Sequence, residues 1–289
     1  MNSRELAYFV AVAEEANFSR AAARLGIAQP PLSRAIKQLE NRLGVVLLKR
    51  NSREVSLTPA GAVLLDEGRK ALSALAFAET LTRRTGQAGR QLKVVMKPAG
   101  DAGLLDSILD MYSKHPDAIE VESHVCGLGQ ELPLLREGAA DVAFMRTPQA
   151  DLSGLAHEEL LREHEMAVVP SRHPLAHRAS VEMADLAGEI QPRWSPQDSG
   201  PGPLISDTGQ IAELIARGRM IAVVPESAAR LLGYDLVTVP VVGRTTTLLA
   251  VWREDRRERA LAAFVRACVE ASAKAAVRGN NTGREPTFL

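Results

Sequence analysis

The chain has 289 residues, of which 46% are hydrophobic and 24% charged, so it is long enough for two or three domains and has an ordinary globular composition. Its net charge of zero argues against a protein that binds nucleic acid or membranes indiscriminately. Two cysteines, Cys126 and Cys268, are too few for a disulfide scaffold, and there is neither a signal-peptide pattern nor a run of about 18 apolar residues. We therefore expect a cytoplasmic protein with two buried thiols and no membrane partner.

The charge is distributed unevenly along the chain. From Met1 to Thr58, nine lysines and arginines oppose five glutamates, which leaves +4 on this segment and −4 on the remainder. A basic segment on an acidic body suits a protein that contacts phosphate groups at one end only. The basic segment should begin with a helix from Ser3 to about Ala16.

The stretch from Phe18 to Arg53 predicts a helix-turn-helix and a wing. Ser19 can cap a short helix, Gly26 supplies the left-handed residue of a tight turn, and Gln29-Pro30-Pro31 can start a second helix because proline is tolerated in a first turn. The residues expected to face inward are Ala22, Ala23 and Leu25 in the first helix and Leu32, Ala35, Ile36, Leu39 and Leu43 in the second.

The outward face of the second helix and the wing carry polar and cationic side chains. The apolar run 43–48 and the alternating segment 55–57 predict the two strands of the wing. Cations and small polar groups in this arrangement are typical of a DNA-reading helix and of a wing that contacts the backbone or the minor groove. Solvated surface charges are the alternative. The residues concerned are Ser33, Arg34 and Lys37 on the helix and Arg50 and Arg53 on the wing.

Thr58-Pro59 provides another cap and first-turn proline, and residues 60–84 should form one long helix. Its apolar residues have a near-heptad spacing that the wing alone cannot cover, so we expect it to pair with the same helix of a second subunit. Packing on its own body is the alternative, and Gly86–Gly89 should be a hinge. The residues expected at the dimer interface are Leu64, Leu65, Ala71, Leu72 and Leu75.

From Gln91 onward, strands alternate with helices, which predicts parallel pairing in an α/β sheet. The expected strands are 92–96, 119–124, 142–145, 164–169, 221–224 and 246–252, and the expected helices are 104–112, 131–137, 210–217 and 258–274. Ligands bind beyond the carboxyl ends of such strands, which selects the segments 97–101, 127–130, 146–148 and 193–195. The residues chosen from them are Pro98, Gly100, Asp101, Gly127, Leu128, Arg146, Arg193 and Trp194.

Two of these residues have a structural alternative, since Asp101 can cap the next helix and Arg146 can pair with an acidic neighbour. The sequence contains no nucleophile elbow, phosphate-binding loop or dinucleotide motif. Pro174 also disrupts the helical spacing of His173 and His177. We therefore expect no enzyme, no metal site and no cofactor.

Three segments of the chain match a family pattern: LAYFVAVAEEANFSRAAARLGIAQPPLSRAIKQLENRLGVVLLKR followed by LTPAG, then VPSRHPLA, then IAELIARGRMIAVVPES. They resemble the LysR-type transcriptional regulators. The resemblance implies a winged helix-turn-helix at 1–58, a dimerising linker helix and hinge at 59–89, and an α/β effector domain at 90–278. The polar composition of the last residues predicts a disordered tail at 279–289. The effector domain should have two subdomains like those of periplasmic solute-binding proteins, with subdomain I at about 90–161 and 253–278 and subdomain II at about 162–252.

The resemblance also implies partners: double-stranded DNA with an interrupted dyad, an unidentified small-molecule effector in the interdomain cleft, and further copies of the chain in a dimer or dimer of dimers. Between Pro192 and Ile211 the chain has only a short Pro/Gly-rich passage, so subdomain II should be trimmed. A DNA-binding regulator without an effector, and an α/β ligand-binding or enzymatic domain with an incidental DNA-binding head, are the alternatives. The implied DNA contacts are Ser19, Arg20, Gln29, Pro30, Pro31, Ser33, Arg34, Lys37, Arg50 and Arg53.

Overall fold

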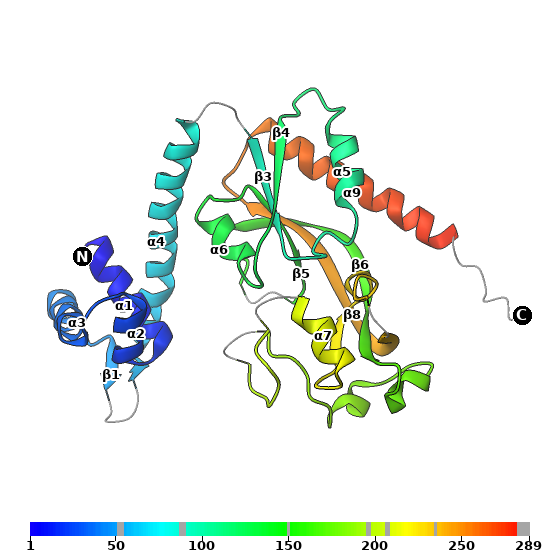
Figure 1. The fold of residues 1–289 in the computed structure, drawn as a ribbon. Helices are drawn as coiled ribbons and strands as arrows, with labels where there is room; N and C mark the ends of the chain where they lie inside the picture. Colours follow the sequence, from blue (N-terminus) through cyan, green and yellow to red (C-terminus); the bar gives the residue numbers. More distant parts are fainter. Residues whose placement is uncertain are drawn as a thin grey trace, which may run out of the picture. The chain divides into compact units, whose positions relative to one another are not determined.

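The computed structural model describes residues 1–50, 55–86, 91–148, 151–194, 198–205, 209–233 and 236–281 (Figure 1). The chain divides into two compact units, Met1–Arg83 and Arg84–Leu289. The first unit contains the winged helix together with most of the following long helix, and the second is the α/β body. The boundary therefore lies near the end of the long helix rather than at its start.

The first unit contains the predicted helix-turn-helix and wing. Its elements are α1 (Ser3–Glu15), α2 (Phe18–Arg24), α3 (Gln29–Leu43), β1 (Leu48–Arg50), β2 (Val55–Leu57) and the start of α4 (Pro59–Thr85). The strands β1 and β2 pair antiparallel. The first strand was expected from Leu43, but α3 extends through that residue and ends at Gly44, whose φ of 70° suits glycine.

The start of α2 differs from the prediction in one residue. The cap is Asn17, whose Oδ1 accepts hydrogen bonds from the backbone N–H groups of Ser19 (2.9 Å) and Arg20 (3.0 Å). The predicted cap Ser19 is therefore wrong. Gly26 does have the expected left-handed conformation, with φ of 65°.

The core of the first unit forms around α3. Leu32, Ile36 and Leu39 are fully buried, as the helical spacing predicted. The prediction that Ala23 and Leu43 face inward is wrong. Ala23 is exposed, and Leu43 is 42% exposed because it lies in the last turn of α3.

The helix α4 begins with the predicted cap, since Thr58 Oγ1 accepts a hydrogen bond from the Gly61 N–H (3.0 Å). Its first half packs onto the winged helix. At Gly68 the approach is so close that an added Cβ would lie 2.8 Å from the Leu6 side chain. Three of the residues assigned to a dimer interface pack against this core within one chain, namely Leu64, Leu65 and Leu72.

The second unit is built on a six-stranded sheet with the order β4-β3-β5-β8-β6-β7. The short 3₁₀ helices η1 (Pro174–His177) and η2 (Met183–Leu186) follow β6. The other elements are β3 (Gln91–Met96), α5 (Leu105–Tyr112), β4 (Glu120–Val125), α6 (Glu131–Arg136), β5 (Val142–Arg146), β6 (Leu155–Pro170), α7 (Gly209–Ala216), β7 (Ala222–Pro225), α8 (Glu226–Ala229), β8 (Leu236–Arg253) and α9 (Arg259–Asn281).

The sheet is only partly parallel. β3 pairs parallel with β4 and β5, as predicted, whereas β8 runs antiparallel to β5 and β6, and β7 antiparallel to β6. β6 and β8 have 16 and 18 residues, far more than the expected 164–169 and 246–252. They pass through the whole body side by side, with a register shift between His164 and Met166 where the pairing on β8 moves from Thr245 to Pro240.

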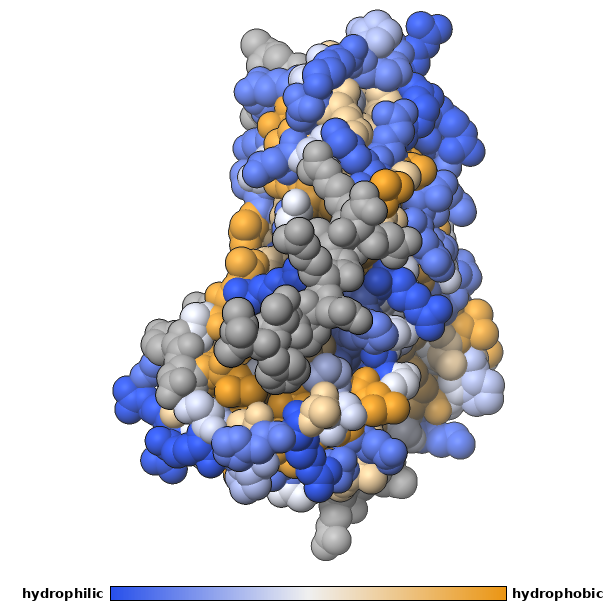
Figure 2. All heavy atoms as spheres, turned by 90° about the vertical axis from the view of Figure 1, so that its right-hand side faces the viewer, coloured by the Kyte–Doolittle hydropathy of each residue, from blue (hydrophilic) through white to orange (hydrophobic). Residues whose placement is uncertain are grey.

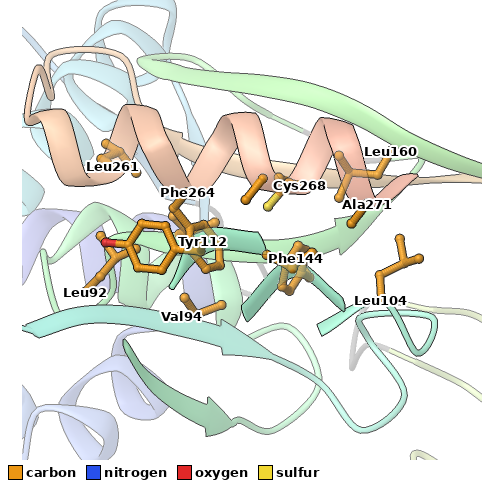
Figure 3. Close-up of a cluster of buried hydrophobic side chains, with 14 of the residues drawn as sticks. Leu92, Val94, Leu104, Tyr112, Phe144, Leu160, Leu261, Phe264, Cys268 and Ala271 are labelled. Carbon is orange, nitrogen blue, oxygen red and sulfur yellow. The ribbon is translucent and has the colours of Figure 1, made fainter. Parts of the chain in front are cut away.

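The closing helix α9 packs on the half of the sheet formed by β3 and β5 (Figure 3). Tyr112 of α5 meets Phe264 of α9 edge to face, with ring centroids 5.3 Å apart, and Cys268 is buried beside them. α9 extends to Asn281, so residues 279–281, which were expected in a disordered tail, are helical. Residues 282–289 lie outside the described part of the chain.

Between β6 and α7 the described part of the chain has two short 3₁₀ helices, η1 and η2, and no long helix. Where residues 192–205 are described, their only strand-like pairing is an isolated bridge between Arg193 and Leu204, and the trimming of subdomain II stays a prediction. Hydrophilic residues cover much of the face in Figure 2, with hydrophobic residues in patches between them. No described helix is long and apolar enough to cross a membrane.

Candidate nucleic-acid interface and ligand cleft

The outward face of α3 presents two cations side by side. Arg34 and Lys37 are exposed, and the described part of the chain offers neither of them a hydrogen bond or an ion pair. They are three residues apart and therefore project from one face of the helix. Gln29, Pro30 and Pro31 are exposed at the N-terminus of the same helix, and Ser33 is half-buried.

The other arginines that the structure describes in α1 to α4 mostly have carboxylate partners. Arg24 pairs with Glu14 at 2.7 Å, Arg42 with Glu5 at 2.8 Å, and Arg69 with Glu14 at 2.8 Å. The hydrogen bond from Arg42 lowers the pKa of the Glu5 carboxyl. Arg4 on α1 and Lys49 on β1 are also exposed without a described partner, but on α3 two such cations lie on one face of a single helix.

Four of the predicted DNA contacts lie on segments other than α3: two in α2 and two in the wing. Arg20 is 65% exposed, but its Nε lies 3.4 Å from the Glu15 carboxylate and its Nη2 donates to the Glu15 carbonyl oxygen, so it is already engaged within the chain. Ser19 is exposed beside it. Arg53 and the side chain of Arg50 lie outside the described residues, so their assignment stays a prediction.

The body contains a cleft of about 290 Å³ between its two halves. It is bounded by the carboxyl ends of β3 and β5, by the segment after β4, and by β6, β7, β8, α7 and α8, as expected for an α/β sheet. Four predicted ligand residues line it: Pro98, Leu128, Arg146 and Trp194. The lining residues missing from that prediction are Lys97, Ala99, Thr147, Pro148, Glu165, Ile211, Val223, Val224, Pro225, Ala228 and Thr246.

The other four predicted ligand residues are not on the lining. Asp101 accepts a hydrogen bond from the N–H of Leu105, the first residue of α5, at 3.2 Å, which is the capping alternative. Gly100 forms a tight turn, because an added Cβ would lie 2.6 Å from the Lys97 carbonyl oxygen. Arg193 Nε donates to the Gly202 carbonyl oxygen (2.9 Å), and Gly127 accepts from Gln130 N–H (3.1 Å).

Arg146 is the central polar residue of the cleft. Its side chain is only 4% exposed, and it forms an ion pair with Glu163 of β6. Its Nη2 donates to Ser227 Oγ at 2.9 Å, and the Ser227 N–H donates to Glu163 Oε1 at 3.0 Å. The predicted alternative, an ion pair with an acidic neighbour, is therefore confirmed, and this network joins β5, β6 and α8.

Lys97 has a different environment on the same wall. It is half-buried directly after β3, and no described residue forms a hydrogen bond or an ion pair with its ammonium group. Desolvation by burial lowers the pKa of Lys97, and the negative charge of Glu131 opposes that effect. The sequence signal was a charged residue immediately after an apolar strand, within the segment 97–101.

The thiols show no metal-binding arrangement. Cys268 is fully buried, and desolvation raises its pKa, whereas Cys126 is half-buried, with a pKa raised by burial and then by Glu131. The expectation of two buried thiols is thus fulfilled only by Cys268. In the part of the chain that is described, no group of three or more His, Cys, Asp or Glu side chains could hold a metal ion.

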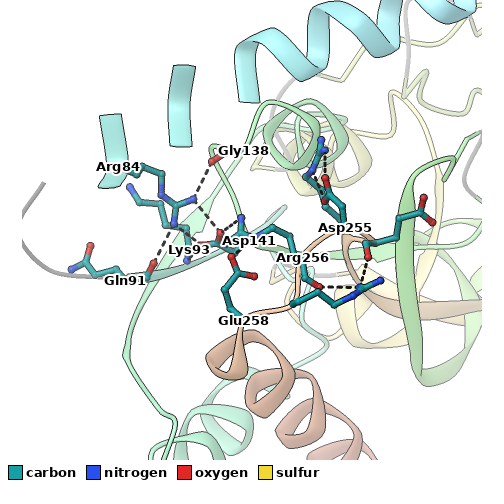
Figure 4. A network of polar contacts seen from close by, with 11 residues as sticks. Arg84, Gln91, Lys93, Gly138, Asp141, Asp255, Arg256 and Glu258 are labelled. Carbon is teal, nitrogen blue, oxygen red and sulfur yellow. Dashed lines mark hydrogen bonds and ion pairs between the residues drawn. The ribbon is translucent and has the colours of Figure 1, made fainter. Parts of the chain in front are cut away.

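A buried carboxylate fixes the end of α4 to the body (Figure 4). Asp141, just before β5, has a side chain that is 1% exposed. It accepts from Arg84 in the last turn of α4 (2.6 and 3.1 Å) and from the Lys93 N–H (2.8 Å), and it forms an ion pair with Arg256 (3.1 Å). A predicted hinge begins right after this anchored turn, but Gln87–Gly89 of it lie outside the described residues.

Comparisons with known proteins agree with this division of the chain. Residues 3–62 match the family model of the bacterial regulatory helix-turn-helix protein, lysR family, and residues 85–204 match that of the LysR substrate binding domain. The chain is 31% identical over 287 residues to the Hca operon transcriptional activator HcaR of Escherichia coli (strain K12), with 92% of this chain and 96% of that protein covered.

Solved structures of complete regulators share the fold. Full-length BenM matches with a TM-score of 0.52 and 28% identity, covering all of both chains. Full-length CbnR complexed with its target DNA matches with a TM-score of 0.51 and 25% identity, covering 94% of this chain and 100% of that one. On this sequence likeness, the chain belongs to the LysR family of bacterial regulatory helix-turn-helix proteins.

Proposed function

We propose that this protein is a sequence-specific transcription factor that binds an interrupted dyad in double-stranded DNA through α3. The observation that carries the proposal is the pair of exposed, unpaired cations Arg34 and Lys37 on a helix whose other face is anchored in a core. Such a helix can enter a major groove, with cations meeting phosphates or guanine edges and Gln29 offering both a donor and an acceptor to adenine.

One recognition helix covers only a few base pairs, so specificity requires two heads at a fixed spacing. α4 supports the pairing of two subunits, because its second half keeps an exposed apolar stripe after the first half has packed on the winged helix. Leu75 and Leu81 on this stripe are 54% and 37% exposed. Ala71 and Ala78 are also exposed there.

Selection of DNA from a random pool tests the DNA-binding proposal. The full chain should enrich sequences with two related half-sites, and footprinting should show both half-sites protected. A pool that shows no enriched sequence, or one half-site only, would contradict the proposal.

Substitution of Leu75 tests the pairing of subunits. Leu75→Glu should shift the protein to smaller species in sedimentation velocity and abolish protection of the second half-site, because a charge replaces an apolar contact. Val63→Glu is the matched control, since Val63 is 65% exposed on the first half of α4. An unchanged assembly in Leu75→Glu would show that the stripe is not the interface.

The cleft supports a regulatory role for the body rather than a catalytic one. Its buried Arg146–Glu163 pair joins elements from both halves of the body, so a ligand between these halves can shift their arrangement. A thermal-shift screen tests this role, because a ligand that binds the folded state raises the melting temperature by mass action. If no compound of a broad metabolite library raises it, the body acts without an effector and protein abundance sets the activity.

A further inference from the structure

We propose that the cleft takes a small organic monoanion whose acidic group binds Lys97 and whose apolar part lies against Trp194, Ile211 and Val223. The inference rests on the proposed function and deepens it, because it names the class of molecule that controls the protein and the residue that selects it. No covalent step is involved.

Among the residues that the structure describes, the ionisable side chains on the cleft lining are Lys97, Arg146 and Glu165. Arg146 is paired with Glu163, and Glu165 accepts from Arg244 at 2.7 Å, so the charges of these two lining residues are balanced. The ammonium group of Lys97 has three N–H donors, and no described residue provides an acceptor for them. Lys97 is therefore the lining charge that is left to meet a ligand.

The one carboxylate in the described part of the chain that acts on the pKa of Lys97 is not close enough to take the place of a bound anion. Glu131, in the first turn of α6, raises the pKa of Lys97 through its charge but lies beyond the 4.0 Å of an ion pair. The turn next to Lys97 offers few competing donors, because Pro98 has no N–H and the Gly100 N–H donates to the Lys97 carbonyl oxygen at 2.8 Å. An anion entering here meets Lys97 before any other donor identified on this turn.

The remaining wall selects an apolar body for the ligand. Ile211 of α7 and Val223 of β7 line the cleft, and the indole of Trp194 is 41% exposed beside them. A volume of about 290 Å³ is at the lower end of ligand pockets, so the ligand is small. Arg146 is already paired with Glu163, so a second acidic group would find no second unpaired cation among the described lining residues, which disfavours dianions.

The charge of Lys97 makes the affinity of the cleft for a monoanion depend on pH. Burial lowers the pKa of this lysine in the empty cleft, and a bound anion favours the ammonium form and raises it again. Affinity for a monoanion should therefore be highest where Lys97 is charged and should fall as the pH rises through its lowered pKa. An arginine at this position would remain charged and remove that decline.

The test uses pairs of probes that differ only in their acidic group: cyclohexanecarboxylate and phenylacetate, each against its primary amide, with succinate as the dianion. Binding to the full chain is followed by calorimetry. The acids should bind tenfold or more tightly than the amides and than succinate, an effect of about 1.4 kcal/mol. Lys97→Met should abolish that preference, and Lys97→Arg should keep it without the decline at high pH.

The matched control is Lys93→Met, which removes the nearby lysine within β3, whose Nζ pairs with Glu122 at 3.0 Å. It should bind the probes like the wild type. Equal affinity for acid and amide, persistence of the acid preference in Lys97→Met, or no binding of either acid at millimolar concentration would each overturn the inference. Selection from random DNA, measured separately, shows whether the proposed function fails on its own.

Discussion

The outer face of α3 and the cleft of the body both present cations that no described carboxylate neutralises, in very different surroundings. Arg34 and Lys37 are exposed to solvent, so leaving them charged costs little and salt screens their attraction for an anion. Lys97 is half-buried among apolar residues, so its charge is costly until an anion arrives. The first arrangement suits a polyanion and the second a single small anion.

The largest difference between the two regions should appear in stability. Glu163→Ala leaves the buried Arg146 guanidinium without its carboxylate, which should lower the free energy of unfolding of the body by about 3–5 kcal/mol. Arg34→Ala should change it by less than about 0.5 kcal/mol. Urea unfolding followed by tryptophan fluorescence measures the body, where both tryptophans lie, and far-UV circular dichroism also follows the helical first unit that contains Arg34. Similar losses of unfolding free energy in Glu163→Ala and Arg34→Ala would show that the two regions do not differ in this way.

For DNA affinity, the substitution on α3 should have a larger effect than the substitution in the body. Arg34→Ala should weaken binding to a selected site by about 1–3 kcal/mol, or roughly 5- to 150-fold, because a groove contact is lost while the fold remains. Arg69→Ala is the control, since this arginine is 54% exposed but paired with Glu14. Gel-shift titration measures the affinity, and circular dichroism and sedimentation check fold and assembly. Loss of either in Arg34→Ala would mean that the residue has a structural role.

Salt dependence should separate the phosphate contacts from the cleft. Lys37→Ala should reduce the slope of log affinity against log salt concentration by about 1 per head, because one fewer counterion is released. Binding of a carboxylate probe to the cleft should depend on salt much less, since Lys97 is partly shielded from solvent. An unchanged slope in Lys37→Ala would show that this lysine does not face a phosphate.

The smallest expected effect is on a thiol near the cleft. The charge of Lys97 lowers the pKa of Cys126, against the larger raising effects of burial and of Glu131. Lys97→Met should therefore raise that pKa further and slow alkylation of Cys126 by iodoacetamide at a fixed pH, as followed by mass spectrometry. Cys268 is the internal control, because it is fully buried and should react in neither protein. Faster alkylation in the variant would mean that Lys97 does not act on this thiol.

The winged helix was predictable because short-range patterns determine it. Proline at the start of α3, glycine at its end and apolar residues at helical spacing all act within one or two turns of the chain. The length of β6 was not predictable in this way, because the segment 156–165 alternates poorly and carries many charged side chains. In β8, Pro240 and Gly243 interrupt the pattern that would have indicated a single long strand.

The cleft was predictable only as a location. The rule for carboxyl ends of strands selected the right segments on β3, β4 and β5, but Glu165, Ile211 and Val223 reach the cleft from strands and a helix far along the chain. The buried position of Arg146 likewise involves residues far along the chain, since its partners are Glu163 and Ser227. The capping role of Asp101 was the local alternative, and the structure shows it directly.

The anchoring of α4 by Asp141 has a geometric consequence for the DNA-binding heads. α4 has 27 residues, and at 1.5 Å per residue it is about 40 Å long. Its last turn is held at Arg84, and its first half packs against the winged helix. A tilt of only about 5° at the anchored end of such a rod displaces the other end by about 3.5 Å, close to the spacing of adjacent base pairs. A straight helix of this length therefore turns a small angular change at one of its ends into a displacement comparable to one base-pair step at the other.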